Sequence, residues 1–187
     1  STMLKEADNL EIKLKEPEAL DKYKEVLVAD QKNMKALVKS TELNIYIGGR
    51  QKEKKDKLLY FQSALAFAQR AVAADANNAD ANYAMSLANS KLWEIEKENK
   101  KLAAFIKDTK TYADKALAIN PKHGKANYMM GKFNVELFNM ADVKRTAVKT
   151  FFGEGNIPVT TIEQAIPYFE KCRVAEPYFM LNYLELA

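Results

Sequence analysis

The sequence predicts an all-α protein in which helical hairpins stack into a right-handed superhelix, within one domain that spans residues 1–187. Composition is the first reason: Ala, Lys, Leu and Glu dominate, while only six glycines and five prolines occur in 187 residues, which favours helices over strands. The second reason is that small and apolar residues recur at helical spacing, and the third is that turn-forming residues end each such segment. We expect no β-strand.

A pattern of small and apolar residues occurs four times, each time at positions i, i+4 and i+7 of a segment that ends at a turn. This spacing places the three residues on one face of a helix, where small side chains let a second helix approach closely. The four copies are Ala19, Tyr23 and Val26; Ala64, Ala68 and Ala71; Thr109, Ala113 and Ala116; and Ala165, Phe169 and Cys172. They start at 19, 64, 109 and 165, so the steps are 45, 45 and 56 residues. We therefore predict four stacked hairpins.

Ten segments have the apolar periodicity of a helix and are bounded by turn residues. They lie at 3–15, 18–29, 33–47, 53–75, 79–97, 100–119, 123–139, 141–152, 161–175 and 178–187. Residues Thr160 to Glu163 are typical of a capping box at the start of the ninth segment. Pro167 falls inside that segment and is expected to kink the helix or to delay its start. The glycine-rich stretch 153–159 lacks the Gly-Lys-Ser/Thr ending of a phosphate-binding loop, so we expect a plain connector.

The internal arrangement of each copy resembles the signature of tetratricopeptide repeats, in which a small residue, an apolar residue, a second small residue and a helix-ending proline follow one another. The third copy shows it most completely, with Thr109, Ala113, Ala116 and then Pro121. Tetratricopeptide repeats have about 34 residues, whereas HEAT and armadillo repeats have roughly 40–47. We interpret the chain as tetratricopeptide-like hairpins that are elongated to about 45 residues per repeat.

The region from about Asn120 to Ala187 carries a more specific resemblance. The residues that carry it are Asn120, Pro121, His123, Gly131, Phe152, Gly153, Glu154, Pro158, Ala165, Tyr168, Phe169, Glu176, Pro177, Leu181, Asn182 and Leu184. With these residues the region resembles the tetratricopeptide domain of the regulator of microtubule dynamics family. The resemblance implies the same fold. It also implies a lipid-like ligand as an alternative, because one eukaryotic member is associated with organelle tethering and with lipid binding by this domain.

The concave face is where we expect a ligand, because the first helix of each repeat lines that face in stacked hairpins. Tyr83 and Tyr128 occupy equivalent positions there, each within an Ala-Asn-Tyr-x-Met phrase. Tyr combines a rigid apolar ring with a polar tip, which suits a recognition surface, although the same rings could simply seal the helix packing. The predicted groove residues are Lys35, Glu42, Tyr46, Tyr83, Lys91, Lys125, Tyr128 and Lys132.

This groove lacks the carboxylate clamp with which some tetratricopeptide proteins hold chaperone C-termini. The clamp needs Lys and Asn at set positions. The matching positions hold Val38, Glu42, Tyr83, Leu87 and Tyr128. Lys125 and Lys132 could still meet a carboxylate or a phosphate, but we do not expect a chaperone partner.

Catalytic and metal-binding patterns are absent from the sequence. His123 is the only histidine, which excludes a histidine-based triad and a two-histidine metal site. Cys172 is the only cysteine, and its position on a helix face favours packing over reactivity. We therefore expect a protein that is not an enzyme and binds no cofactor and no metal.

The charge pattern argues against nucleic acid as a partner. The net charge is +4, and the lysines are mixed with glutamates rather than gathered on one face with aromatic residues. No run of about 18 apolar residues occurs, so we expect no transmembrane segment, and the first residues lack the basic start and apolar stretch of a signal peptide. We expect a soluble protein, either cytoplasmic or exported after signal-peptide removal, and the single cysteine leaves the compartment open.

These features predict a non-enzymatic scaffold that binds a protein partner in its concave groove, as a peptide or as a helix. A lipid-like apolar ligand in the same groove is the alternative. The last helical segment ends at Ala187 with Tyr183, Leu184 and Leu186 uncovered. We therefore expect either that the native chain continues past Ala187 or that a homodimer forms through this helix.

Overall fold

The computed structural model describes residues 2–152 and 159–187, and within these ranges the chain forms ten α-helices and no strand. They are α1 (Thr2–Ile12), α2 (Glu16–Ala29), α3 (Met34–Gly49), α4 (Lys54–Ala74), α5 (Ala79–Ile95), α6 (Asn99–Ile119), α7 (Gly124–Phe138), α8 (Asp142–Phe152), α9 (Ile162–Ala175) and α10 (Met180–Leu186). Each overlaps one predicted segment, and the ends differ by at most three residues. The all-α prediction is confirmed.

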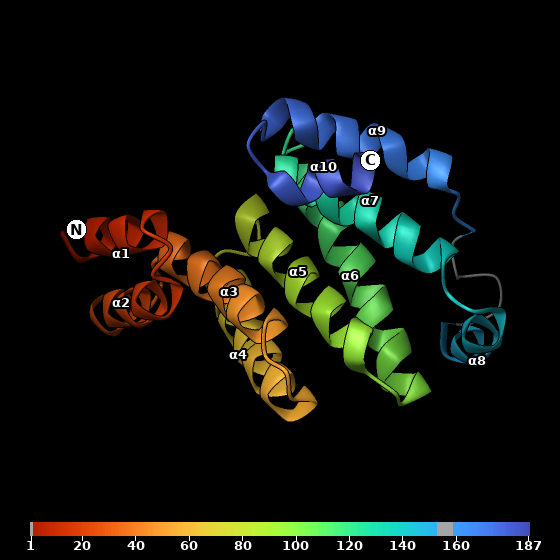
Figure 1. The fold of residues 1–187 in the computed structure, drawn as a ribbon, viewed down its shortest axis with the longest axis horizontal. Helices are drawn as coiled ribbons and strands as arrows, with labels where there is room; N and C mark the ends of the chain where they lie inside the picture. The colour runs from red at the N-terminus through yellow and green to blue at the C-terminus, as the bar shows by residue number, and fades with distance from the viewer. Residues whose placement is uncertain (1, 153–158) are drawn as a thin grey trace.

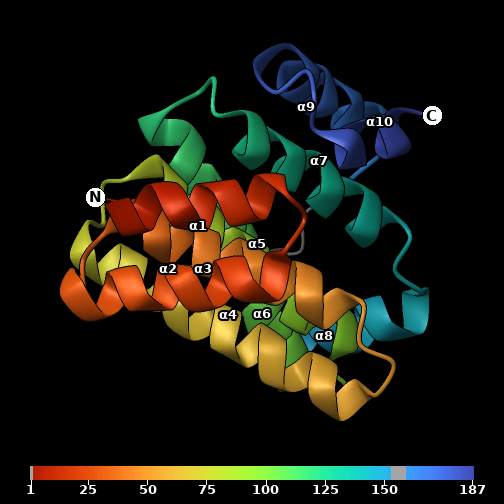
Figure 2. The ribbon, with the colours of Figure 1, turned by 60° about the vertical axis from the view of Figure 1, so that its left-hand side comes forward.

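The helices form two layers of a curved stack. α1 pairs with α2, α3 with α4 and α5 with α6, and α5 also packs against α3 and α7. Figure 1 shows α3, α5 and α7 side by side in one layer, with α4 and α6 behind them. Figure 2 shows the hairpin of α1 and α2 covering the N-terminal end of this stack. The first helices of successive hairpins therefore share one face, as a helical-repeat superhelix requires.

The fourth hairpin differs from the others because its two helices are not consecutive. α7 pairs with α9, while α8 lies between them in sequence and packs instead against α6. The step from the third to the fourth copy of the repeat pattern is 56 residues rather than 45. The insertion that contains α8 accounts for this longer step.

The turns between hairpins repeat with a period of 45 residues. Asn33, Asn78 and His123 are the N-caps of α3, α5 and α7, and each side chain accepts a hydrogen bond from the backbone N–H three residues later. These bonds measure 3.1, 3.0 and 3.0 Å. A capping side chain satisfies a donor that the first turn of a helix leaves free. The repeat is therefore built into local hydrogen bonding as well as into hydrophobic spacing.

The repeat pattern itself forms the contact between helices. All twelve residues of the four copies are buried, and none is more than 2% exposed. In α3 and α5 the facing positions hold Thr41 and Ser86. The Ser86 hydroxyl donates to the carbonyl oxygen of Thr109 (2.8 Å), and the Thr41 hydroxyl lies 3.0 Å from the carbonyl oxygen of Leu37 in its own helix and 3.4 Å from that of Ala64 in α4. In α7 the equivalent position is Gly131. A Cβ at Gly131 would lie 2.5 Å from the ring of Phe169, so the glycine lets α7 and α9 approach closely.

The start of α9 differs slightly from the prediction. The capping box is formed by Thr161 and Gln164, one residue later than predicted, and the Thr160 hydroxyl donates to the Asn134 carbonyl oxygen instead. α9 begins at Ile162 and continues through Pro167, so Pro167 does not delay the helix. Pro167 is the sixth residue of the helix, so it removes the backbone hydrogen bond that an N–H at this position would donate to the carbonyl oxygen of Glu163. The predicted connector at 153–159 lies outside the described residues except for Val159.

In the parts of the chain at 2–152 and 159–187, no helix combines the length and the apolar character that crossing a membrane requires.

Candidate functional site

A groove of about 540 Å³ runs along the shared face of α3, α5 and α7. Residues just before and within α8 and α10 also line it. Its principal side chains are Ile45, Tyr46, Arg50, Tyr83, Leu87, Lys91, Trp93, Glu94, Tyr128, Met129, Lys132, Phe133, Glu136, Met140, Lys144, Phe179 and Leu181. The volume falls within the range of roughly 300–1,000 Å³ that is usual for ligand pockets.

Aromatic residues form much of the groove wall. The rings of Trp93 and Phe133 meet edge to face with centroids 5.8 Å apart, and those of Tyr128 and Phe179 do so at 5.0 Å. Such pairs fix ring orientation beyond what burial alone would achieve. Burial is also the main reason why the pKa of Tyr128 rises to about 12, so this phenol keeps its proton at neutral pH and offers a donor to a ligand.

The lysines of the groove wall are mostly paired. Lys91 Nζ lies 2.5 Å from a carboxylate oxygen of Glu94, and Lys132 Nζ lies 2.9 Å from both Glu136 and Glu185. Burial lowers the pKa of Lys132, but the hydrogen bonds to the two glutamates outweigh it and raise the pKa above its usual value. The groove therefore presents charges of both signs in fixed pairs.

A buried carboxylate lies beside the groove. The Glu42 side chain is 2% exposed, and it accepts hydrogen bonds from Lys125 Nζ (2.6 Å) and the Tyr83 hydroxyl (3.1 Å). Lys39 Nζ lies 3.5 Å away on the other side. A buried charge is tolerated only when partners of this kind compensate it. Burial, followed by the negative charge of Glu42, raises the pKa of Tyr83 well above its usual value.

The same polar network continues toward α1, away from the groove. Lys39 Nζ pairs with Glu11 at 2.7 Å, and the Tyr23 hydroxyl donates to Asp8 (2.7 Å) and Glu11 (3.0 Å). Lys35 pairs with Asp8 at 2.6 Å. The network thus ties α1, α3, α5 and α7 together along the concave face.

Five of the eight predicted groove residues line the groove, and three lie beside it in the polar network. Those in the groove are Tyr46, Tyr83, Lys91, Tyr128 and Lys132, and those in the network are Lys35, Glu42 and Lys125. The sequence reasoning left out Trp93, Phe133 and Lys144. Trp93 is only 7% exposed, and it is part of the groove wall. Lys144 could not be found by the repeat pattern, because α8 is outside the repeat.

His123 and Cys172 have packing and capping roles in this fold. His123 Nδ1 accepts the bond from the Ala126 N–H, which leaves Nε2 to donate to Asp80 at 2.9 Å. Cys172 is fully buried, and burial raises the pKa of its thiol to about 11, which makes a reactive thiolate unfavourable. Within the described residues, no three His, Cys, Asp or Glu side chains are grouped so that they could hold a metal ion.

The family described as Regulator of microtubule dynamics protein 1-3 matches residues 3–187. The chain is similar in structure to TTC0263, a thermophilic TPR protein in Thermus thermophilus, with a TM-score of 0.59 and 14% identity over 98% of this chain and 94% of that one. It also matches MamA with a TM-score of 0.49 and 20% identity, over 96% of this chain and 79% of that one. A search of curated proteins finds no match. The likeness to TTC0263 shows a tetratricopeptide-like fold.

Proposed function

The chain belongs to the regulator of microtubule dynamics family, and from this premise and the groove we propose that it is a non-enzymatic scaffold that binds a protein partner. The partner enters the groove of α3, α5 and α7 as a peptide or as a helix. Tetratricopeptide-like folds present an extended concave surface of this kind for partners. The observation that carries the proposal is a groove that combines aromatic rings with paired lysines and glutamates.

The composition of the groove supports a peptide as the occupant. Tyr and Trp are enriched where proteins bind partners, because their rings offer large rigid contact area with a polar tip. Tyr46, Tyr83, Tyr128 and Trp93 all line this groove. The Lys91–Glu94 and Lys132–Glu136 pairs lie among these rings and offer donors and acceptors to a peptide backbone.

The first experiment is a selection from a random 12-residue peptide library displayed on phage, followed by titration of a synthetic peptide of the enriched sequence. Trp93 is the only tryptophan in the chain and lines the groove, so its fluorescence reports occupancy. Gly49→Phe should weaken binding about tenfold or more, because Gly49 lines the groove and a Cβ there meets no atom within 4 Å. A Cβ can therefore be added at this position without a clash, and we expect the ring to occupy part of the groove.

A matched pair of lysine variants serves as a control. Lys132→Ala breaks the groove pair with Glu136 and should weaken binding about threefold. Lys110→Ala breaks the Lys110–Asp114 pair of α6, which has the same i, i+4 spacing but does not line the groove. Equal effects of the two variants, or full binding by Gly49→Phe, would place the peptide elsewhere and contradict the proposal.

A lipid-like ligand is the second candidate, and the apolar part of the groove favours it. Leu87, Trp93, Met129, Phe133 and Met140 are among the residues that line it, and a groove of about 540 Å³ could hold an acyl chain. Native mass spectrometry of the purified chain without added ligand tests this candidate. A lipid-sized adduct that Gly49→Phe and Tyr128→Ala both remove would support it, and a ligand-free mass would leave the peptide as the occupant. The same spectrum reports whether two copies associate.

A further inference from the structure

We propose that the inserted helix α8 is a recognition element of the groove, and that it selects a peptide segment with an acidic residue at the α8 end. This inference rests on the proposed function, since it specifies the partner that the scaffold binds. Insertions into repeat proteins commonly lie on the binding face. α8 lies in sequence between the two helices of the last hairpin, α7 and α9, and the pattern of 45-residue steps does not account for it.

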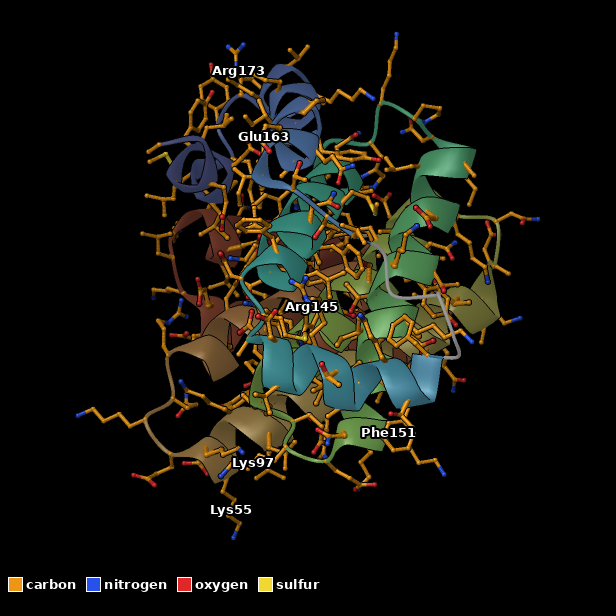
Figure 3. All side chains as sticks on the ribbon, turned by 90° about the vertical axis from the view of Figure 1, so that its right-hand side faces the viewer. Lys55, Lys97, Arg145, Phe151, Glu163 and Arg173 are labelled. Atoms are coloured by element: carbon orange, nitrogen blue, oxygen red, sulfur yellow. The ribbon has the colours of Figure 1, made fainter. Side chains whose placement is uncertain are left out.

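The position of α8 is fixed by contacts with α6 and α7. Val148 is fully buried and belongs to the same hydrophobic cluster as Trp93 and Phe133 of the groove wall. Arg145 donates from Nη2 to the carbonyl oxygens of Leu137 and Phe138 at the end of α7, where the helix dipole favours a cation. Figure 3 shows Arg145 on the side of α8 that faces α7 and Phe151 on the opposite side. α8 is therefore held in a defined orientation at the end of the groove.

Lys144 differs from the other cations of the groove. Lys91, Lys132 and Arg50 are each paired with a glutamate. Lys144 lines the groove and is exposed, and among residues 2–152 and 159–187 no ion pair to it is found. A ligand carboxylate can therefore pair with Lys144 without first displacing a glutamate of the protein.

The surroundings of Lys144 add charge and apolar surface. α8 carries Lys144, Arg145 and Lys149 against a single acidic residue, Asp142, so the helix itself has a net positive charge. Val143, next to Lys144, is 85% exposed. The surface is thus complementary to a segment in which an acidic residue is adjacent to an apolar one.

Two pools of synthetic peptides test the inference. Both have the same Leu, Tyr and Phe content, and one contains Glu and Asp where the other contains Lys and Arg. Titration by Trp93 fluorescence should show that the acidic pool binds about tenfold more tightly than the basic pool. The preference should decrease as salt is raised, because exposed charges are screened.

Two charge reversals on α8 provide the decisive comparison. Lys144→Glu should weaken the affinity for the acidic pool about tenfold and remove the preference for acidic peptides. Lys149→Glu should change the affinity for the acidic pool less than about twofold. Both variants change the net charge equally and lie on one helix, but only Lys144 lines the groove. Equal effects of the two reversals would mean that net charge alone acts, and would overturn the inference.

The remaining outcomes separate this inference from the scaffold function. If both pools bind equally and Gly49→Phe removes the binding of both, the scaffold function stands and the role of α8 is refuted. If neither pool binds while the phage-selected peptide still does, the role of α8 is refuted and the scaffold stands, and if no peptide binds, both proposals fail. A last outcome would be binding to phosphatidylcholine vesicles that contain about a quarter phosphatidylserine. If both reversals remove this binding and neither peptide pool is preferred, α8 binds an anionic membrane surface and the peptide proposal is overturned.

Discussion

At one equivalent position, the hairpins α3/α4 and α5/α6 have a hydroxyl of the first helix that bonds to the backbone of the second, whereas α7/α9 has a glycine that makes room for an aromatic ring. Thr41 and Ser86 provide the hydroxyls, and Gly131 faces Phe169. At this position the regular hairpins have small residues on both helices, so the helices approach closely and a hydrogen bond joins them. The last hairpin joins helices separated by α8, and a large buried ring gives it the apolar contact that it needs.

The difference shows that helices with the same repeat pattern can pack in two ways. In the regular hairpins the turn between the helices is short and the pairing is local. In the last hairpin the insertion lengthens the connection, so closing the hairpin costs more chain entropy. Phe169, which is 2% exposed, offsets part of that cost, and the insertion adds Lys144 to the end of the groove.

The largest effect is expected from exchanging one packing solution for the other. Phe169→Ala should lower the free energy of unfolding by about 3–5 kcal/mol, because it leaves a cavity in a buried contact. Gly131→Ser should cost about 1–3 kcal/mol, because its side chain meets the Phe169 ring. The double variant recreates the arrangement of Ser86, so its cost should be less than the sum of the two. Urea unfolding of the four proteins measures this coupling, and strictly additive costs would contradict the packing argument.

A smaller effect is expected where α8 attaches to the repeat. Val148→Ala removes two buried methyl groups and should cost about 1–2 kcal/mol, and the loss should be confined to α8. Hydrogen exchange should then accelerate at the amides of α8 while those of α3 and α5 keep their protection. Val143→Ala is the matched control, because Val143 lies on the same helix and is 85% exposed. Faster exchange throughout the chain would show that α8 and the repeat unfold as one unit.

The repeated caps should contribute similar amounts to stability. Asn33→Ala, Asn78→Ala and His123→Ala each remove the acceptor for one backbone N–H and should each cost about 1 kcal/mol. Thermal unfolding compares them, with the exposed neighbour Asn77→Ala as a control. A negligible cost at one position would show that the turn there is held by packing alone.

The smallest effect distinguishes the His123 cap from the two asparagine caps, since only His123 contacts Asp80 through its second nitrogen. The hydrogen bond from His123 is the main cause that holds the pKa of Asp80 below its usual value. A lowered carboxyl pKa stabilises the folded state above the unfolded value of about 3.9, and this stability is lost as the pH falls through the folded pKa. The Asp80 side chain is 63% exposed, so its contribution should be below about 1 kcal/mol.

Denaturant unfolding of the wild type and Asp80→Asn between pH 3 and 7 tests this contribution. The difference in stability should be constant near neutral pH and should vanish in acid. A difference that persists unchanged at pH 3 would mean that the carboxylate charge is not its cause.

Local features of the fold could be predicted from the sequence. The ten helices and the buried face at i, i+4 and i+7 were both predicted. These features depend on interactions within a few residues or on a repeated spacing, so the sequence states them directly. The capping box was misplaced by one residue, because Thr160 and Thr161 both satisfy the pattern and only the bond of Thr160 to Asn134 distinguishes them.

By itself, the sequence determined a stack of elongated helical hairpins and the tyrosines on its concave side. Tertiary structure alone decided that α7 pairs with α9 across α8, that Glu42 is buried between Lys125 and Tyr83, and that Lys144 reaches the groove. The physical reason is the range in sequence over which the interactions act. Helix periodicity and capping act between residues near in sequence, whereas the partner of a charge and the contact of an inserted helix depend on where the whole chain brings distant segments together.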